Sequence, residues 1–281
     1  MVALHLNRNV DDIFSGYSKL ETPEERMEHK VEGSLMFEGF EELMKAYEEV
    51  ISIKNLGKTQ TNEKIVIELP YILTPKEINT FLQSTVRYED YENYGWNTGF
   101  FLTSLIQNSY NHGNTKFLLN TKTLSKEINS IGNSLKGKKN KIIELSIRGD
   151  VGDCCGSNAE HINLSVEGNA GDCCGSSATN SILNISGDVG WGCGAYNAQH
   201  STFTILGMAA TNDLAVFTGR SGGLHGNFAE KCIFKTSNKK TLQLLIYDVT
   251  RGNEIYLIKP NGKEKKVHRA KDIFYAILGK Y

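Results

Sequence analysis

The sequence has little proline, no long apolar run and no excess of either charge. Only four of its 281 residues are proline. The most apolar stretch, residues 99–106, is far shorter than the roughly 20 residues that span a bilayer. Because 31 Lys and Arg residues offset 32 Asp and Glu, the formal net charge is −1, and it gives no reason to expect nucleic acid or an anionic membrane as partner. A hydrophobic content of 40 % still suffices for a large core, which excludes wholesale disorder.

The first residues show neither the apolar segment nor the cleavage pattern that is typical of a secretion signal. We therefore expect a cytoplasmic protein in which the six cysteines are reduced thiols.

The first half of the chain mixes predicted helices with short predicted strands. Its apolar spacing favours helices over 24–53, from a cap at Thr74, over 97–110 and over 125–135, and strands over 65–69 and 116–119. Thr74, Pro75 and Glu77 have the spacing of a capping box with proline at the first helical position. Glu38 and Glu42 lie one helical turn apart and are interpreted as a solvated face. Residues 1–140 are thus predicted to form an α/β cap domain.

An internal repeat of 19 residues begins near residue 141. Residues 149–157 (GDVGDCCGS) align with residues 168–176 (GNAGDCCGS), and 9 of the 19 positions are identical between these two copies. A third copy starts at Gly187, and a degraded fourth starts at Gly207 after one inserted residue. A short fixed period with one strand and one glycine-rich turn per copy predicts a solenoid.

Apolar residues recur at fixed places in these copies. Three columns stand out, formed by Leu145, Leu164, Leu183 and Phe203, by Ile147, Val166, Ile185 and Ile205, and by Val151, Ala170, Val189 and Ala209. Two columns that are two residues apart indicate one inward strand face in every coil, with adjacent coils parallel and about 4.8 Å apart. The glycines at 149, 168, 187 and 207 are interpreted as a recurring bend with positive φ.

The run Gly149-Asp-Val-Gly-Asp153, followed by a strand and by Gly168-Asn-Ala-Gly-Asp172, resembles the GXGXG repeat. That repeat occurs in the C-terminal domain of the large subunit of glutamate synthase and in one subunit of formylmethanofuran dehydrogenase. The resemblance covers about residues 141–210 and implies a right-handed β-helix. It also implies a structural domain that packs against other domains or subunits, which hold the cofactors.

The predicted fold class is therefore α+β. An N-terminal α/β segment is followed by a right-handed parallel β-helix with 19-residue coils and a C-terminal capping helix, so that residues 141–281 form the solenoid domain. After the repeat we expect strands over 215–217, 232–234, 242–247 and 254–258, and the capping helix over 270–278.

Cysteine supplies the first candidate site. Cys155, Cys174 and Cys193 fall in one column, and Cys154 and Cys173 fall in the neighbouring column. Stacked thiols fit a narrow core, which is the favoured interpretation. Thiols one coil apart could also share a soft metal ion or act as reactive groups, and these alternatives stay open.

The glycine-rich loop 219–226 is the second candidate. Ser221 fits the G-x-S-x-G pattern of a nucleophile elbow, with Asp248 and His268 downstream, and His225 lies in the same loop. Because no upstream parallel sheet of a hydrolase is seen, a turn is the favoured interpretation. We assign no catalytic residue, no metal ligand and no cofactor.

Two polar columns accompany the repeat. His161, Asn180 and His200 are interpreted as surface residues, because the two histidines lie two coils apart, too far to share an ion. Asp150, Asn169 and Asp188 are expected to bond to the backbone of the turns.

Together these features favour a non-catalytic scaffold or accessory subunit that acts through protein–protein contacts. Its partner would be another protein or a second copy, and not nucleic acid or a membrane. The alternative is an enzyme or metal-binding protein that uses the cysteine columns or loop 219–226.

Overall fold

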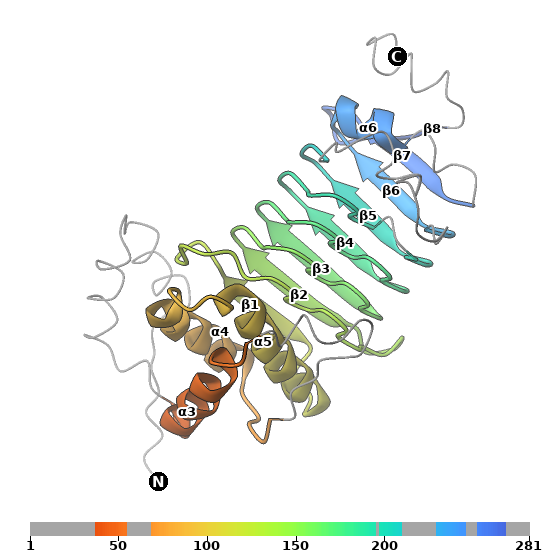
Figure 1. Cartoon of the computed structure of the whole chain (residues 1–281). Coiled ribbons are helices and arrows are strands. Elements are labelled where there is room, and N and C mark those ends of the chain that lie inside the picture. Colours follow the sequence, from red (N-terminus) through yellow and green to blue (C-terminus); the bar gives the residue numbers. More distant parts are fainter. Residues whose placement is uncertain (1–36, 55–68, 195–196, 210–228, 246–251, 268–281) are drawn as a thin grey trace.

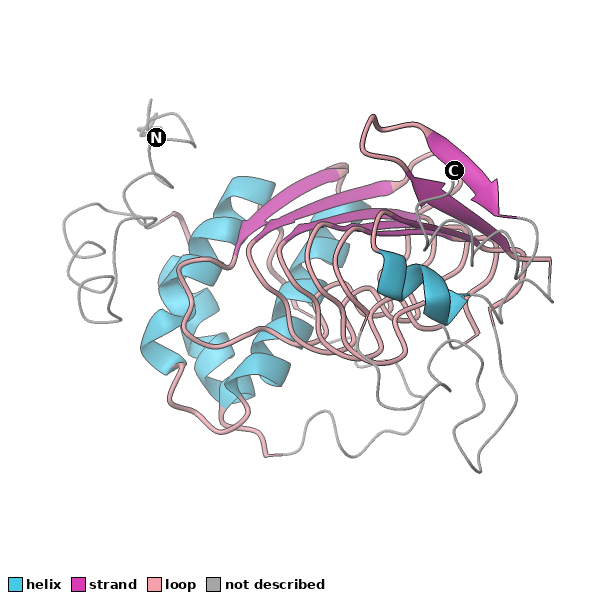
Figure 2. Cartoon of the chain, turned by 90° about the horizontal axis from the view of Figure 1, so that it is seen from above, coloured by secondary structure: helices cyan, strands magenta, loops and turns pink. Residues whose placement is uncertain are grey.

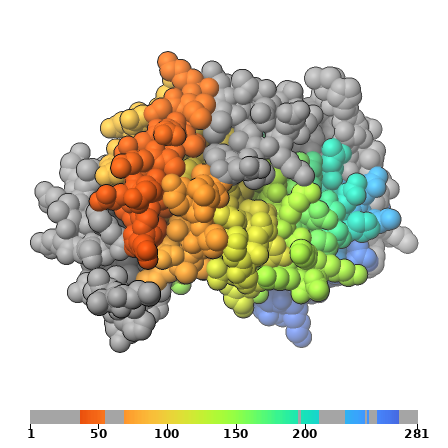
Figure 3. All heavy atoms as spheres, turned by 90° about the horizontal axis from the view of Figure 1, so that it is seen from below, coloured from red at the N-terminus to blue at the C-terminus, as the bar shows by residue number. Residues whose placement is uncertain are grey.

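The computed structural model describes residues 37–54, 69–194, 197–209, 229–245 and 252–267 (Figure 1). These residues form a mixed α/β structure in which the helices of residues 40–111 lie at one end of an eight-stranded, mostly parallel sheet and one short helix lies at the other end. The strands follow one another in chain order, and the sheet is open, with the first and the eighth strand at its edges. Seen from below, the helical end and the successive repeats cross the face in sequence order (Figure 3).

The helical end contains α3 (Phe40–Ile51), α4 (Pro75–Ser84), the 3-10 helix η1 (Thr85–Tyr88) and α5 (Tyr94–Asn111). The predicted capping box is confirmed, because the Thr74 backbone N–H donates to Glu77 Oε2 at 2.7 Å and the Glu77 N–H donates to Thr74 Oγ1 at 3.3 Å. The helix expected over 97–110 is α5, and α3 is the described part of the one expected over 24–53. Residues 24–36 and 65–68 lie outside the described residues.

The parallel part of the sheet joins the helical end to the repeats. Its strands are β1 (Lys116–Asn120), β2 (Ile143–Arg148), β3 (Ile162–Glu167), β4 (Ile182–Ile185), β5 (Thr202–Ile205), β6 (Ile233–Thr236) and β7 (Glu254–Ile258). The antiparallel strand β8 (Glu264–Val267) then closes a hairpin with β7. The predicted columns are confirmed, since Leu145, Leu164, Leu183 and Phe203 pair in register and are buried.

Each repeat also contacts the next one outside the strands. One row of parallel bridges joins Val151, Ala170, Val189 and Ala209, and a second joins Lys136, Glu160, Thr179, Gln199 and Glu230. The connecting turns of successive repeats lie beside one another on one face of the sheet (Figure 2). Two repeats are therefore held together at one strand and at two further points.

The interpretation of the recurrent glycines is correct only at Gly149, whose φ is 113°. Gly168, Gly187 and Gly207 do not have positive φ. They are needed for close approach, because a Cβ on Gly168 would lie 2.4 Å from the carbonyl oxygen of Gly149. The same crowding by the previous repeat occurs at Gly187 and Gly207.

The helix predicted over 125–135 is wrong, because this segment is a series of turns. The Ser130 N–H donates to the Asp153 carbonyl at 2.7 Å, and the Ser134 N–H donates to the Ser157 carbonyl at 2.7 Å. The segment thus pairs with the turn of the following repeat instead of bonding to itself. The sheet accordingly starts at β1, although the solenoid domain was predicted to begin at residue 141.

The strand predicted over 242–247 is also wrong where the structure describes it. Residues Lys239–Leu245 form the helix α6, and the Asn238 side chain accepts the N–H groups of Lys240 and Thr241 at 2.9 and 3.2 Å. The strands expected over 232–234 and 254–258 correspond to β6 and β7. The strand over 215–217 and the capping helix over 270–278 lie outside the described residues.

Helix α4 covers the edge of the sheet at β1. The Asn120 N–H donates to Asn79 Oδ1 at 2.9 Å, and Gln83 Nε2 donates to the Asn120 carbonyl at 2.8 Å. These two side chains hydrogen-bond to backbone groups of β1 that an edge strand otherwise leaves free to pair with a strand of another chain.

Candidate functional site

The five cysteines of the repeat lie in two stacks, as the sequence predicts. In the first two turns a cysteine with left-handed backbone, Cys154 or Cys173, precedes a buried cysteine and then a glycine, and in the third turn Gly192 takes the left-handed place before Cys193. The Gly175 N–H donates to the Cys155 carbonyl and the Gly194 N–H donates to the Cys174 carbonyl, both at 2.8 Å. The turn of each repeat is therefore held directly on the turn before it.

The inner stack consists of Cys155, Cys174 and Cys193, which are all 0 % exposed. The hydrogen bond to Cys174 and burial raise the pKa of the thiols of Cys155 and Cys193. The same hydrogen bonds lower the pKa of Cys174. Because all three sulfurs are closed to solvent, the inner stack behaves as core. The Cys232 thiol is buried as well.

The outer pair consists of Cys154 and Cys173, which are half-buried. The hydrogen bond with Cys173 and partial burial raise the pKa of the Cys154 thiol, whereas the same bond lowers the pKa of Cys173. The two thiols are thus joined by a hydrogen bond, and of the five stacked cysteines this pair alone is partly open to solvent.

Replacing Cys174 by alanine is expected to destabilise the protein by about 1–2 kcal/mol, since a fully buried sulfur is lost from a packed core. The free energies of unfolding of C174A and C173A, measured in urea at equal protein concentration, check this prediction. Cys173 is the matched control one residue away and should cost less than about 0.5 kcal/mol. If C173A proves the more damaging of the two, the inner stack is not the core.

Ser221, His225 and the rest of loop 219–226 lie outside the described residues, as does Asp248. In the part of the chain that the structure describes, no three His, Cys, Asp or Glu side chains are arranged to hold a metal ion.

The expected hydrogen bonding of the polar column Asp150, Asn169 and Asp188 to the turn backbone is confirmed. The side-chain oxygens of Asp150, Asn169 and Asp188 accept the N–H groups of Asn169, Asp188 and Met208, at 2.7, 2.8 and 2.6 Å. A second ladder, which the sequence did not reveal, starts at Asn129: its side chain accepts the Asp153 N–H at 2.7 Å, and Asp153 in turn accepts the Asp172 N–H at 2.8 Å. Each carboxylate therefore has a structural role between two repeats.

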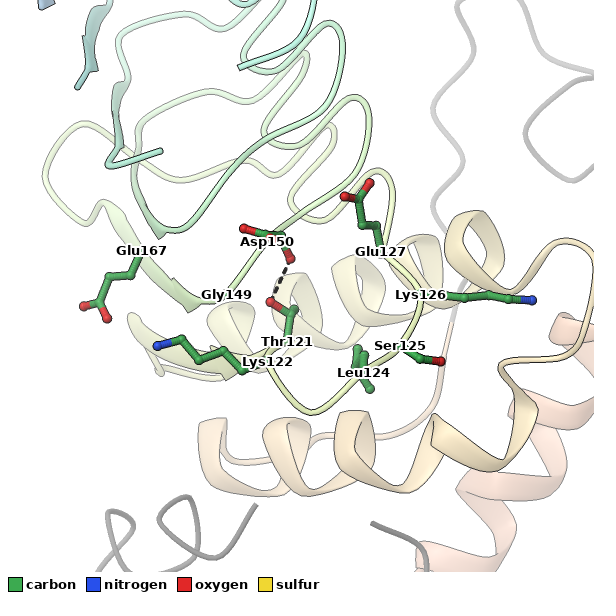
Figure 4. A pocket seen from close by; sticks show the side chains of 9 residues that line it. All are labelled: Thr121, Lys122, Leu124, Ser125, Lys126, Glu127, Gly149, Asp150 and Glu167. Atoms are coloured by element: carbon green, nitrogen blue, oxygen red, sulfur yellow. Dashed lines mark hydrogen bonds between the residues drawn. The ribbon is translucent and has the colours of Figure 1, made fainter. Parts of the chain in front are cut away.

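A pocket of about 400 Å³ lies where the helical end meets the first repeats (Figure 4). Its lining residues are Thr121, Lys122, Leu124, Ser125, Lys126, Glu127, Gly149, Asp150 and Glu167. The Thr121 hydroxyl donates to the Asp150 carbonyl at 2.8 Å. Sequence reasoning missed this pocket because it placed a helix over 125–135, where a loop forms the wall.

Burial and the neighbouring carboxylates of Asp150 and Asp153 raise the pKa of Glu127 in this pocket. The ionised carboxylate of Glu127 destabilises the folded state. This destabilisation is absent while Glu127 is protonated, and it appears as the pH rises through the folded-state pKa. E127Q is therefore expected to unfold at a higher temperature than the wild type at pH 7, and the difference should close well below the ordinary Glu pKa of about 4.3.

Thermal unfolding at neutral and acidic pH checks this, with E49Q on the exposed side of α3 as the control. An unchanged or lower Tm of E127Q at pH 7 would contradict the assignment.

In the described residues no helix is both long and apolar enough to cross a membrane. Comparison of the chain with models of protein families, with curated proteins and with solved structures finds no match. Function is therefore argued from the geometry of the chain itself.

Proposed function

We propose that the repeats form a right-handed parallel β-solenoid of the GXGXG type. The strands β2, β3 and β4 pair in register at intervals of 19 residues, and the two rows of bridges follow the same interval between residues 151 and 189. Three recurring points of contact per repeat support a coil that returns to the same path each time.

The stack then serves as a non-catalytic scaffold or accessory subunit that binds another protein through the outer face of the sheet. One observation carries this proposal, the row of short polar side chains that crosses that face in register: Ser146, Ser165, Asn184 and Thr204. Such side chains are exposed or half-buried and are fixed to a hydrogen-bonded sheet. Binding a partner there orders few flexible groups, which lowers the entropic cost of association.

An apolar side chain flanks this row. Ile182, at the start of β4, is 43 % exposed and lies beside Asn163 and Thr202 of the neighbouring strands. A buried apolar anchor surrounded by polar contacts is the usual composition of a protein interface. We propose a protein partner or a second copy of the chain as the occupant, and neither nucleic acid nor a membrane, since the net charge is −1.

The setting proposed for this protein is the cytoplasm. All six cysteines are free thiols, and four of them are buried in the core, which fits a reducing compartment.

Mild affinity isolation from the native organism tests the function. The wild type should retain a stoichiometric amount of its partner. The double variant S165R/N184R should retain at least about tenfold less partner, because two bulky cations then lie at the centre of the face. E49R, which places arginine on the exposed side of α3, should retain the partner as the wild type does. A chain that is isolated alone, or equal retention by the double variant, would overturn the proposal.

A further inference from the structure

The outer pair of thiols has a regular geometry that the proposed scaffold does not use. Cys154 and Cys173 have nearly the same left-handed backbone, with φ of 59° and 56°. The Cys154 N–H donates to the Asp172 carbonyl at 2.7 Å, and the Cys173 N–H donates to the Trp191 carbonyl at 2.6 Å. Each cysteine is therefore anchored to the following repeat in the same way, and the two side chains leave parallel backbones at neighbouring levels of the stack.

The spacing of the stack is compatible with an ion held between the two sulfurs. Neighbouring levels of parallel backbone lie about 4.8 Å apart, and a disulfide, with Cα atoms about 4.4–6.8 Å apart, fits this spacing too. A disulfide forms only when two electrons pass to an oxidant, whereas binding an ion between two thiolates requires none. With metal–thiolate bonds near 2.3 Å, an ion in line between two sulfurs holds them up to about 4.6 Å apart, close to the spacing of the two levels.

Charge and accessibility also distinguish this pair from the inner stack. Cys154 and Cys173 are half-buried, whereas Cys155, Cys174 and Cys193 are fully buried. The carboxylates of Asp153 and Asp172 lie near enough to Cys173 to oppose the loss of its proton. Two bare thiolates are disfavoured there, and a cation between the sulfurs offsets part of that repulsion.

We propose that Cys154 and Cys173 form a two-sulfur site that binds one soft monovalent cation of the Cu(I) class. Thiolate sulfur is a preferred ligand of Cu(I) and of zinc, but zinc takes four ligands, whereas two ligands in line satisfy Cu(I). On binding, each thiol releases its proton to solvent and donates a sulfur lone pair to the ion. No electron is transferred, so neither an oxidant nor a reductant is required.

The chain itself provides the matched substitution. Ser130 occupies the corresponding place in the turn before Cys154, with φ of 59° and the same kind of backbone bond, to the Asp153 carbonyl at 2.7 Å. Serine is thus compatible with this position and removes only the sulfur. C154S and C173S are the test variants, and C232S, outside the pair, is the control.

The experiment is a titration of the full chain with Cu(I) under nitrogen, followed by native mass measurement in the presence of a competing Cu(I) chelator. The wild type and C232S should each retain one ion, and both thiols of the pair should then resist alkylation. C154S and C173S should each bind about tenfold more weakly or not at all, with unfolding curves that show an intact fold.

Equal retention of Cu(I) by C154S or C173S would overturn the proposal by placing the ion elsewhere, for instance in the inner stack. Wild-type protein that binds no ion, or that forms a disulfide between Cys154 and Cys173 in preference to the complex, would overturn it as well. Loss of partner binding by S165R/N184R with unchanged Cu(I) uptake separates this site from the proposed scaffold surface.

Discussion

A single methyl group at Gly168 is expected to destabilise the protein by about 3 kcal/mol, although the backbone there has no unusual φ. A Cβ on Gly168 would lie 2.4 Å from the Gly149 carbonyl oxygen and 2.7 Å from Asp150 Oδ1. The same Asp150 oxygen accepts the Asn169 N–H at 2.7 Å, so the methyl group would separate two repeats and break a rung of the side-chain ladder. Urea unfolding of G168A against the wild type measures the loss.

Gly262 is the matched control, since it has a φ of 76° but nothing within 4 Å of an added Cβ. G262A therefore carries only the strain of a left-handed alanine, about 1 kcal/mol. If G168A costs no more than G262A, close approach between repeats is not what requires glycine at position 168.

Truncating Phe203 to alanine is expected to cost about 3–5 kcal/mol, because its ring is buried within the inward column of the sheet. The ring stacks on Phe234 with centroids 5.4 Å apart. It also fills the space that glycines leave in the turns, since a Cβ on Gly175 would lie 2.7 Å from the ring and one on Gly194 would lie 2.9 Å from it.

F203L is the informative comparison, because leucine occupies the same column at 145, 164 and 183. In urea unfolding, F203L should recover more than half of the free energy of unfolding that F203A loses. It should remain about 1.5 kcal/mol less stable than the wild type, because leucine does not fill the space beside the glycines. Equal losses for F203A and F203L would mean that the ring has a role other than filling this column.

The repeat could be predicted from the sequence because its period is carried by residues that must match between neighbours. Leu164 and Leu183 occupy one column because they pair directly, and the Asp-Cys-Cys-Gly run recurs because each turn rests on the turn before. Burial of the second cysteine in each pair also follows, since that position faces the core in every repeat.

The first copy escaped detection because insertions hide its period. Asn129 and Gly132 correspond to Asp153 and Gly156, 24 residues later instead of 19, while Phe117 pairs with Leu145. Ile128, Ile131 and Leu135 have a spacing that also fits a helix, and all three are buried in the stack. The residues at left-handed positions, Ser130, Gly132 and Ser134, are the signals of a turn in this segment.

The error at residues 242–247 has a similar cause. The run is apolar and favours a strand, but the Asn238 side chain accepts the N–H groups of Lys240 and Thr241 at the start of α6. Leu242 and Leu245 of this helix are buried. The pocket beside Glu127 was missed for a second reason as well, because residues 121–127 meet 149–167 only after β1 has paired with β2.

The proposed function depends on repeats that stack in register and form a rigid outer face. The distance between two labelled strands across that face tests this stacking most directly. Spin labels on cysteines placed at Ser146 and Lys235, in a C154S/C173S background, lie on strands four steps apart. Double electron–electron resonance should give one narrow distribution centred near four strand spacings, roughly 19 Å. A broad distribution, or one centred beyond about 30 Å, would contradict the stacked arrangement.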